Sequence, residues 1–369
     1  MKFNDSEIAK YAKVFNSLCK KNKITSFWWD TNFLIKRETN STFENVIKEI
    51  MDCYSEKKEI PNSNPSEFES AKNCVNNMKV GWNLGNTLDA YKYKCFFDEK
   101  TNSWEENIEL RGLSTETCWH MPITTKEMIH YVKELGFNAI RIPITWIGHL
   151  NENNIIDDDW KNRVKTVVDY VLDEKMYCII NVHHDGGANG WVKACESSYN
   201  KFSKRLESIY SQISEIFANY DDKLLFEGVN EILDENSSWE EPTKQASFWV
   251  DKWNQLFVDT VRKSGEKNKN RNLIVMAPAG KDSKTALEQF NMPSDIVENH
   301  LIFEFHNYDP QIFCWHKKTT EDREEIVYWT EEYTKILENV FKTVMSFSDK
   351  LKVPIICGEY AAWPKIISE

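Results

Sequence analysis

Short apolar runs alternate with longer amphipathic stretches from Met78 to the end of the chain, and this alternation limits the possible folds more than any other feature. Each run ends at polar or turn residues, which is typical of a buried β-strand. Strands that alternate with helices predict a parallel sheet covered by helices. The runs predict seven strands, at residues 79–83, 137–143, 177–183, 224–231, 272–277, 301–306 and 353–359, and the stretches between them predict helices such as 125–135, 158–174, 201–220 and 247–265.

The N-terminal segment supplies the strand that these seven lack. A parallel barrel with only seven of its eight strands would leave two open edges. Residues 6–20 and 42–54 predict two amphipathic helices, and the apolar run 24–30 between them predicts a strand that ends in two tryptophans and an aspartate. We therefore predict an α/β fold, a (β/α)8 TIM barrel that is circularly permuted so that the eighth strand, at about 24–30, is N-terminal.

This permutation makes the whole chain, residues 1–369, a single barrel domain. Residues 1–55 would hold the seventh helix, the eighth strand and the eighth helix. Residues 56–66, with two lysines and two prolines, would join the usual termini, and residues 67–369 would hold a capping helix and strands one to seven. The new chain ends would lie in the loop after the seventh strand. Two alternatives stay open: an unrelated N-terminal appendage on a truncated barrel, and a segment cut out of phase from tandem copies of one domain.

Composition narrows the function classes. The net charge of −12 and the pI near 5.3 argue against nucleic acid or an acidic membrane surface as a partner. The 14 Trp, 14 Tyr and 20 Phe suit a polysaccharide binder, because aromatic rings stack on the apolar faces of sugars, although most of them serve the core. The nine scattered cysteines form no CxxC pair, so we expect no zinc knuckle and few or no disulfides. No apolar run is long enough to span a membrane.

Two glutamates each end an apolar run. Glu231 follows Asn230 at the end of one predicted strand, and Glu359 follows Gly358 at the end of another. Parallel α/β barrels carry their catalytic groups at the carboxyl ends of the strands. Two carboxylates on different strands are the minimal equipment for cleaving a glycosidic bond. The alternative is that one or both are surface glutamates just past a strand end.

Further polar motifs stand at the other strand ends and carry a family resemblance. They occupy residues 27–30, 80–90, 141–143, 182–185, 230–231, 306–308 and 358–359. Together they resemble glycoside hydrolase family 5, the large cellulase family of retaining barrels, and in particular its endoglucanase and xyloglucanase branch. The resemblance covers almost the whole chain once the N-terminal unit is moved to the end.

The resemblance implies a role for each strand-end residue. Glu359 would be the nucleophile, and Glu231 would be the general acid and then the general base. Two supporting residues would act on Glu359: Arg141 would hold it ionised, and Tyr308 would donate a hydrogen bond to it. Asn230 would bind the sugar 2-hydroxyl, and His306 would orient Glu231 or the leaving sugar. His184 would lie behind the site.

Substrate-binding residues come from the resemblance and from positions after strand ends. Trp29 would stack under the sugar at the cleavage site, with Trp28 as the alternative, because successive strand residues face opposite ways and the register is open. The other candidates are Asn86, Trp119, His149, His183, Trp191 and Trp315, and loop packing is the alternative for the tryptophans among them. Trp146 and Trp239 also follow strand ends.

The expected function is a retaining endo-β-1,4-glucanase that hydrolyses cellulose-like chains, mixed-linkage glucan and xyloglucan without a cofactor. His183, His184 and Asp185 could alternatively bind a metal, but adjacent strand residues point to opposite faces and rarely ligate one ion. The alternatives are a mannanase or xylanase on the same barrel and a non-catalytic glycan-binding barrel. We expect a monomer. It would be secreted, with any leader absent from this chain, although the sequence leaves a cytoplasmic location open.

Overall fold

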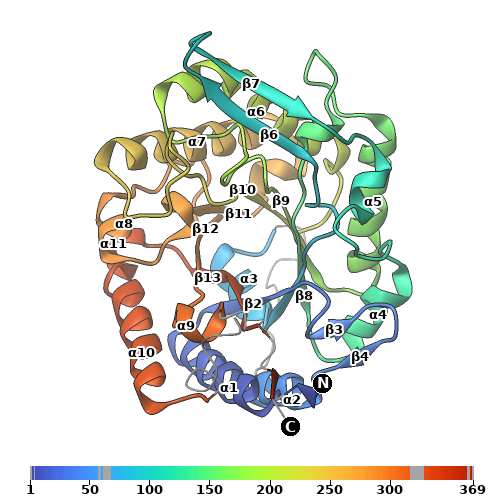
Figure 1. The fold of residues 1–369 in the computed structure, drawn as a ribbon, viewed down its shortest axis with the longest axis vertical. Helices are drawn as coiled ribbons and strands as arrows, with labels where there is room; N and C mark the ends of the chain where they lie inside the picture. Colours follow the sequence, from blue (N-terminus) through green and yellow to red (C-terminus); the bar gives the residue numbers. More distant parts are fainter. Residues whose placement is uncertain are drawn as a thin grey trace.

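Eight parallel strands form one closed barrel in the computed structural model, which describes residues 2–3, 5–56, 60, 68–315, 328–363 and 366–367 (Figure 1). The strands follow the order β10-β11-β12-β13-β2-β5-β8-β9. Their bounds are β2 (Thr25–Asp30), β5 (Gly81–Leu84), β8 (Ala139–Ile142), β9 (Tyr177–Val182), β10 (Leu224–Val229), β11 (Leu273–Met276), β12 (Leu301–His306) and β13 (Ile355–Tyr360). All eight predicted strands are confirmed, with ends that differ by a few residues at most.

The N-terminal strand closes the barrel. β2 pairs in parallel with β13, where Thr25 lies opposite Ile356, and with β5, where Phe27 lies opposite Gly81. Figure 1 shows the consequence: the blue N-terminal segment and the orange-red C-terminal segment lie side by side along the lower edge of the barrel. The predicted pairing of this strand is confirmed, and the alternative of an appendage on a truncated barrel is wrong.

Helices surround the barrel because each carries one apolar stripe. In α1, Ile8, Tyr11, Ala12 and Phe15 are all buried, which confirms the predicted stripe. The helices are α1 (Asp5–Asn22), α2 (Glu44–Tyr54), α3 (Ala71–Asn77), α4 (Lys126–Glu134), α5 (Asp158–Asp173), α6 (Glu196–Ile216), α7 (Lys244–Lys263), α8 (Lys284–Gln289), α9 (Gln311–Cys314), α10 (Glu331–Ser346) and α11 (Ser348–Leu351). Short 3₁₀ turns occur at η1 (Leu113–Thr117), η2 (Ile147–His149), η3 (Glu266–Asn270) and η4 (Pro278–Gly280).

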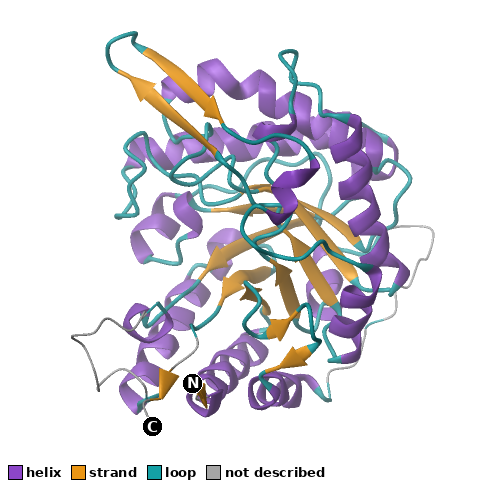
Figure 2. Cartoon of the chain, turned by 45° about the vertical axis from the view of Figure 1, so that its right-hand side comes forward, coloured by secondary structure: helices purple, strands orange, loops and turns teal. Residues whose placement is uncertain are grey.

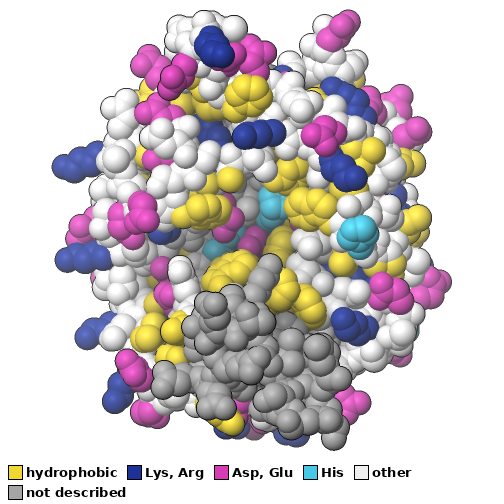
Figure 3. Space-filling model, viewed as in Figure 1, with side chains coloured by type: hydrophobic (Ala, Val, Ile, Leu, Met, Phe, Trp, Pro, Cys, Tyr) yellow, Lys and Arg dark blue, Asp and Glu magenta, His cyan; other side chains and the backbone are white. Residues whose placement is uncertain are grey.

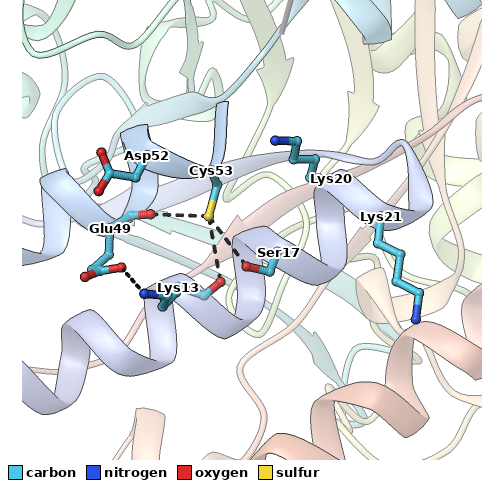
Figure 4. Close-up of a pocket in the computed structure, with 7 residues that line it drawn as sticks. All are labelled: Lys13, Ser17, Lys20, Lys21, Glu49, Asp52 and Cys53. Atoms are coloured by element: carbon cyan, nitrogen blue, oxygen red, sulfur yellow. Dashed lines mark hydrogen bonds and ion pairs between the residues drawn. The ribbon is translucent and has the colours of Figure 1, made fainter. Parts of the chain in front are cut away.

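The two helices of the N-terminal unit pack against each other. Lys13 of α1 forms an ion pair with Glu49 of α2 at 3.0 Å, and the Ser17 hydroxyl of α1 lies 3.6 Å from the Cys53 thiol of α2. A shallow groove with lysines on its α1 side runs between the two helices (Figure 4). These contacts hold α1 and α2 together, and the Trp28 ring of β2 packs edge-on against Tyr11 of α1.

Three small two-stranded sheets among the described residues were not predicted. β6 (Tyr93–Asp98) and β7 (Ser103–Ile108) form an antiparallel hairpin after β5 that projects beyond the barrel (Figure 2). β3 (Ile35–Lys36) pairs with β4 (Ser41–Thr42) after β2. β1 (Lys2–Phe3) pairs with β14 (Ile366–Ile367), so the two ends of the chain lie together.

Most of the predicted linker, 56–66, lies outside the described residues. Within it, the Ile60 backbone exchanges hydrogen bonds of 2.8 and 2.9 Å with the Asn77 side chain of α3. All nine cysteines lie among the described residues, and none of them is in a disulfide, in line with the expectation of few or no disulfides. Among the described helices, none has the length and apolar character that a membrane span requires.

Candidate active site

The two strand-end glutamates face each other across the mouth of the barrel. Glu359 belongs to β13, and Glu231 follows β10 with a φ of 44°, an unusual conformation for a glutamate. An oxygen of each carboxylate lies within 4.8 Å of the other and of a His306 ring nitrogen. Figure 3 shows the hollow at the centre of this face, with acidic and histidine side chains inside it and hydrophobic side chains at its rim.

Arg141 of β8 uses its guanidinium to connect four strand ends. It donates hydrogen bonds to both oxygens of Glu227 (2.6 and 2.7 Å), to Glu359 Oε1 (2.8 Å) and to the side-chain oxygens of Asn83 (3.0 Å) and Asn230 (2.8 Å). Burial opposes its charge, but the carboxylates raise the pKa of Arg141 well above its usual value. Burial also raises the pKa of Glu227 to about 7, although Arg141 opposes this shift. The guanidinium is therefore a fixed cation under the reaction centre.

Glu359 receives one hydrogen bond on each oxygen. Arg141 donates to Oε1, and the Tyr308 hydroxyl donates to Oε2 at 2.8 Å. Burial raises the pKa of Glu359 above its usual value, and the nearby Glu231 adds to that rise, whereas His306 and Arg141 lower it. The predicted contacts of Arg141 and Tyr308 are present, but burial outweighs their effect on this pKa.

His306 connects the two glutamates. Its Nδ1 lies 2.8 Å from Glu231 Oε1 and 3.6 Å from Glu359 Oε2, and its Nε2 lies 3.2 Å from Glu304 Oε1. Burial disfavours a charged ring, but Glu359, Glu231 and Glu304 raise the pKa of His306 well above its usual value. The ring is therefore a second cation of the site.

The two adjacent tryptophans of β2 face opposite sides. Trp28 is 3% exposed and packs edge-on against Tyr11 and Tyr360, between the barrel and α1. Trp29 is half-buried, and its ring stacks on His183 with centroids 5.4 Å apart and planes 9° apart. His183 Nε2 in turn lies 3.9 Å from Glu359 Oε1. Trp29 is thus the tryptophan that reaches the cleft.

Comparison with known proteins agrees with this geometry. The family model for cellulases of glycosyl hydrolase family 5 matches residues 100–364. The chain belongs to glycosyl hydrolase family 5. Endoglucanase A of Clostridium longisporum is 34% identical over 300 residues, which are 80% of this chain and 54% of that protein. The chain thus spans about half the length of this relative.

Two solved structures of family 5 enzymes are similar as well. The Prevotella bryantii B14 enzyme PbGH5A, a mutant of which was solved in complex with the xyloglucan tetradecasaccharide XXXGXXXG, is 37% identical; 79% of each chain is covered, and the TM-score is 0.69. A broad-specificity endoglucanase from Ruminococcus champanellensis with bound cellotriose is 34% identical; 80% of this chain and 81% of that chain are covered, and the TM-score is 0.69.

An aromatic pocket lies beside Glu359 in this family 5 domain. Its aromatic lining consists of Trp28, Trp29, Phe33, Tyr308, Trp315 and Trp363, and the pocket is partly open to solvent. Trp315 is 48% exposed and lies 4.7 Å from the Tyr308 ring. The predicted Trp315 therefore stands next to the site, and Trp363 and Phe33 join it without having been predicted.

A second cluster of rings lies around His184, which is half-buried. Tyr91 and Trp119 pack against the His184 ring at 5.0 and 5.3 Å, and Asp89 Oδ2 lies 3.4 Å from His184 Nε2. Asn86, with a φ of 61°, is partly exposed in the turn after β5. Trp119 and His184 are thus held in contact with one another.

Two predicted substrate-binding residues are wrong, because both are buried away from the cleft. His149 is 1% exposed and stacks on Trp160 with centroids 3.5 Å apart, and burial lowers its pKa to about 3. Trp191 is fully buried, and its indole N–H donates to Asp185 Oδ1 at 2.6 Å. The buried Asp185 carboxylate also accepts hydrogen bonds from the Trp146 and Ile147 backbone amides. A buried carboxylate needs such partners, so it holds the Trp191 side chain inside the protein.

The expectation that the two adjacent histidines point to opposite faces is also wrong. Asp89, His183 and His184 bring ligand atoms within 4.8 Å of one another. β9 ends at Val182, so both histidines lie beyond the strand, and the alternation of faces no longer applies to them. Among the described residues, this group and the group of Glu231, His306 and Glu359 have the spacing of metal ligands. In the second group, His306 already ion pairs with both glutamates.

Two buried carboxylates of the site were not predicted. Glu227 precedes Glu231 by four residues and Glu304 precedes His306 by two, and both are fully buried. Glu304 and His306 both belong to β12, and strand side chains two residues apart share one face; Glu231 lies beyond the end of β10, so this rule does not link it to Glu227. A charged residue inside an otherwise apolar run, just before a polar strand end, was the signal that could have found both carboxylates.

Proposed function

We propose that this family 5 domain is a retaining endo-β-1,4-glucanase that hydrolyses internal links of plant β-glucans: cellulose-like chains, mixed-linkage glucan and xyloglucan. The observation that carries the proposal is the pair Glu231 and Glu359, with oxygens within 4.8 Å across an open hollow. Retaining enzymes hold their carboxyl groups about 5 to 5.5 Å apart, whereas inverting enzymes need about 6.5 to 9.5 Å to admit a water molecule.

In the first step, a Glu359 oxygen attacks the anomeric carbon while the bond to the leaving sugar breaks. Glu231 donates its proton to the departing glycosidic oxygen. Arg141 and Tyr308 fix the two Glu359 oxygens through hydrogen bonds of 2.8 Å each, so the nucleophile needs little reorganisation. The product of this step is a glycosyl ester of Glu359.

In the second step, the Glu231 carboxylate takes a proton from a water molecule, and the oxygen of that water attacks the anomeric carbon. The ester bond to Glu359 breaks, and the sugar leaves with its original configuration. Asn230 stands beside both reactions, because its amide nitrogen lies 3.4 Å from Glu231 Oε2 and its oxygen accepts from Arg141. From this position it would bind the sugar 2-hydroxyl.

The raised pKa of Glu359 has a consequence for the pH profile. The nucleophile must be ionised, so activity is lost as the pH falls through this pKa. Because burial raises the pKa, we expect the acid limb to lie closer to neutrality than it would for an exposed glutamate. A pH profile of kcat/KM on a soluble β-glucan measures this limb.

Aromatic side chains supply the substrate platform. Trp29 lies against His183 beside the nucleophile, and Trp315 and Trp363 continue the apolar surface away from it. Flat apolar rings of this kind suit the faces of glucose units and the branches of xyloglucan. The xyloglucan and cellotriose bound to the two solved relatives support this substrate class. We place the domain outside the cell, because its polymeric substrate cannot cross a membrane. We also propose that it acts as a monomer.

A panel digestion tests the proposal. Wild type and Glu359→Gln would be incubated with barley glucan, xyloglucan, carboxymethylcellulose and mannan, and reducing ends and viscosity would be followed. We expect a fast fall in viscosity on the glucans and β-configured first products by NMR. Faster cleavage of mannan would favour the mannanase alternative. If wild type and Glu359→Gln both release negligible amounts of reducing ends, the result would favour a non-catalytic glycan-binding barrel.

We also infer that the chain is a circular permutation of the family order, with residues 1–55 as the seventh helix and eighth βα unit, 56–66 as the joining linker, and 67–369 as the rest. This inference rests on the family resemblance, in which the motif at 80–90 is that of the first strand and the tryptophan motif at 27–30 is that of the eighth; β2 lies between β13 and β5, where an eighth strand would lie. Moving residues 1–55 behind Glu369 should give a protein that folds and keeps its activity. An unfolded or inactive product would argue against the permutation.

A further inference from the structure

Glu304 is a buried carboxylate for which the two-glutamate mechanism has no use. It belongs to β12, is fully buried, and places Oε1 3.2 Å from His306 Nε2. Its other oxygen, Oε2, has no hydrogen-bond partner among the described residues. The chain makes room for this carboxylate through Gly358, since a β-carbon there would lie only 1.4 Å from Glu304 Oε1. An ionisable group kept at such cost calls for a functional explanation.

The charges around Glu304 show which partner it serves. Arg141 lies 3.5 Å from Glu304 Oε1, but its hydrogen bonds go to Glu227 and Glu359 and to two asparagines. His306 is therefore the one hydrogen-bonding cation left for Glu304 among the described residues. The titratable groups that face this pair are Arg141 from β8, His183 after β9, Glu227 and Glu231 from β10 and its end, Tyr308 after β12, and Cys357 and Glu359 from β13.

We propose that Glu304 is a positioning residue that holds His306 so that one proton is shared between His306 Nδ1 and Glu231 Oε1. This inference rests on the proposed function. The Nε2–H of His306 donates to Glu304, which fixes the ring and directs Nδ1 at Glu231, 2.8 Å away. The shared proton leaves for the glycosidic oxygen in the first step, and water returns it to the pair in the second.

The negative charge of Glu304 has a predictable effect on this proton. A carboxylate next to the imidazole stabilises the protonated pair, in line with the raised pKa of His306. Glu304→Gln keeps an oxygen that can accept from Nε2–H but removes the charge. The pair then loses its proton at lower pH. At these separations, one buried charge moves a neighbouring titration by on the order of one to two pH units.

The test is the pH profile of kcat/KM for wild type and Glu304→Gln. On a β-glucan oligosaccharide, which needs a protonated leaving group, we expect the alkaline limb to move down by at least about one unit. On an aryl glycoside with an activated leaving group, the rate at the plateau should change by less than about threefold, since no proton is needed there. An unmoved limb, or an equal loss on both substrates at every pH, would reduce Glu304 to packing and overturn the proposal.

Asp185→Asn is the matched control. It makes the same carboxylate-to-amide change at another fully buried position, where the partners are Trp146, Ile147 and Trp191 and not His306. We expect it to lower stability without moving the alkaline limb. A limb that moves equally in this control would show a general effect of buried charge and would count against a specific role of Glu304.

NMR titration of the His306 ring separates failure of this proposal from failure of the proposed function. The imidazole of wild type should titrate at higher pH than that of Glu304→Gln, whether or not any glucan is cleaved. If Glu304→Gln does not fold, Glu304→Asp can replace it, because the shorter side chain keeps the negative charge but places it farther from His306. Both the His306 titration and the alkaline limb of the pH profile should then move to lower pH by a smaller amount. Identical His306 titration in wild type and in a folded variant would refute the shared proton.

Discussion

Two adjacent tryptophans of β2 should respond to the same substitution in opposite ways. Trp28 is packed between the barrel and α1, with its ring 5.2 Å from that of Tyr360 and 6.4 Å from that of Tyr11. Trp29 is half-buried and lies on His183 in the cleft. Trp28→Ala should therefore lower the free energy of unfolding, whereas Trp29→Ala should lower kcat/KM.

The magnitudes follow from burial. Removing a fully packed tryptophan from a core costs about 3–5 kcal/mol, which is a large part of the roughly 5–15 kcal/mol that holds a typical domain together. Trp29 contacts fewer groups, and its main apolar partner would be a sugar ring. Losing a contact of about 1.5–3 kcal/mol in the transition state lowers kcat/KM by roughly 10- to 200-fold.

Urea unfolding followed by circular dichroism gives the stability of both variants, and initial rates on a soluble β-glucan give kcat/KM. Trp28→Ala, studied below its unfolding transition, should keep kcat/KM within about threefold of wild type, a change of less than about 1 kcal/mol in the barrier. Equal destabilisation by both substitutions would mean that Trp29 also belongs to the core. Unchanged kinetics in Trp29→Ala would refute its place in substrate binding.

Three further substitutions test the assigned roles. Glu359→Gln should keep the fold, because an amide still accepts from Arg141 and can donate to Tyr308, yet lower kcat by at least about 10⁴-fold, or about 5.5 kcal/mol of barrier; retention of activity within about tenfold would refute the nucleophile. Glu231→Ala should slow unactivated glucans far more than activated aryl glycosides, and azide should partly restore the aryl reaction; equal losses on both would refute the acid–base role. Trp363→Ala should raise KM for xyloglucan several-fold and leave a short aryl glycoside unchanged, and a loss confined to the short substrate would contradict the pocket.

The barrel could be predicted because each of its strands is an apolar run with polar ends. It was harder to predict which face of the barrel each strand residue points to, as Trp28 and Trp29 show. Both faces of a parallel barrel strand are buried, one against helices and one in the barrel, so alternation of polarity disappears. The sequence therefore placed two tryptophans at the end of β2 but left open which of them points to Glu359.

Loop positions were predictable only in part. His149 and Trp191 both follow strand ends, as Trp315 does, yet only Trp315 stays exposed beside the site. The difference comes from Asp185, whose buried carboxylate draws the Trp191 indole and the start of η2 inward. Such a contact between two loops leaves no periodic signal in either of them.

Glu304 was missed for a different reason. An apolar run containing one glutamate still predicts a strand, and nothing within that run shows that the carboxylate faces a histidine. The compensating signal is on the neighbouring strand, where Gly358 leaves out the β-carbon that would collide with Glu304. The two residues are more than fifty positions apart, so only the pairing of β12 with β13 joins them.

The proposed permutation changes which loop of the barrel contains the chain ends, and it leaves the site intact. A closed ring of strands has no first member, so the strand ends around Glu231 and Glu359 keep their places wherever a loop is cut. In this chain the pairing of β2 with β5 is comparatively local, and its pairing with β13 joins residues more than 300 positions apart. With residues 1–55 placed last, the near and far pairings would exchange. Each order contains one distant closure, and the entropy of closing a loop grows only slowly with its length. The permutation should therefore change which edge of β2 forms last during folding, with little effect on stability or on the geometry around Glu231 and Glu359.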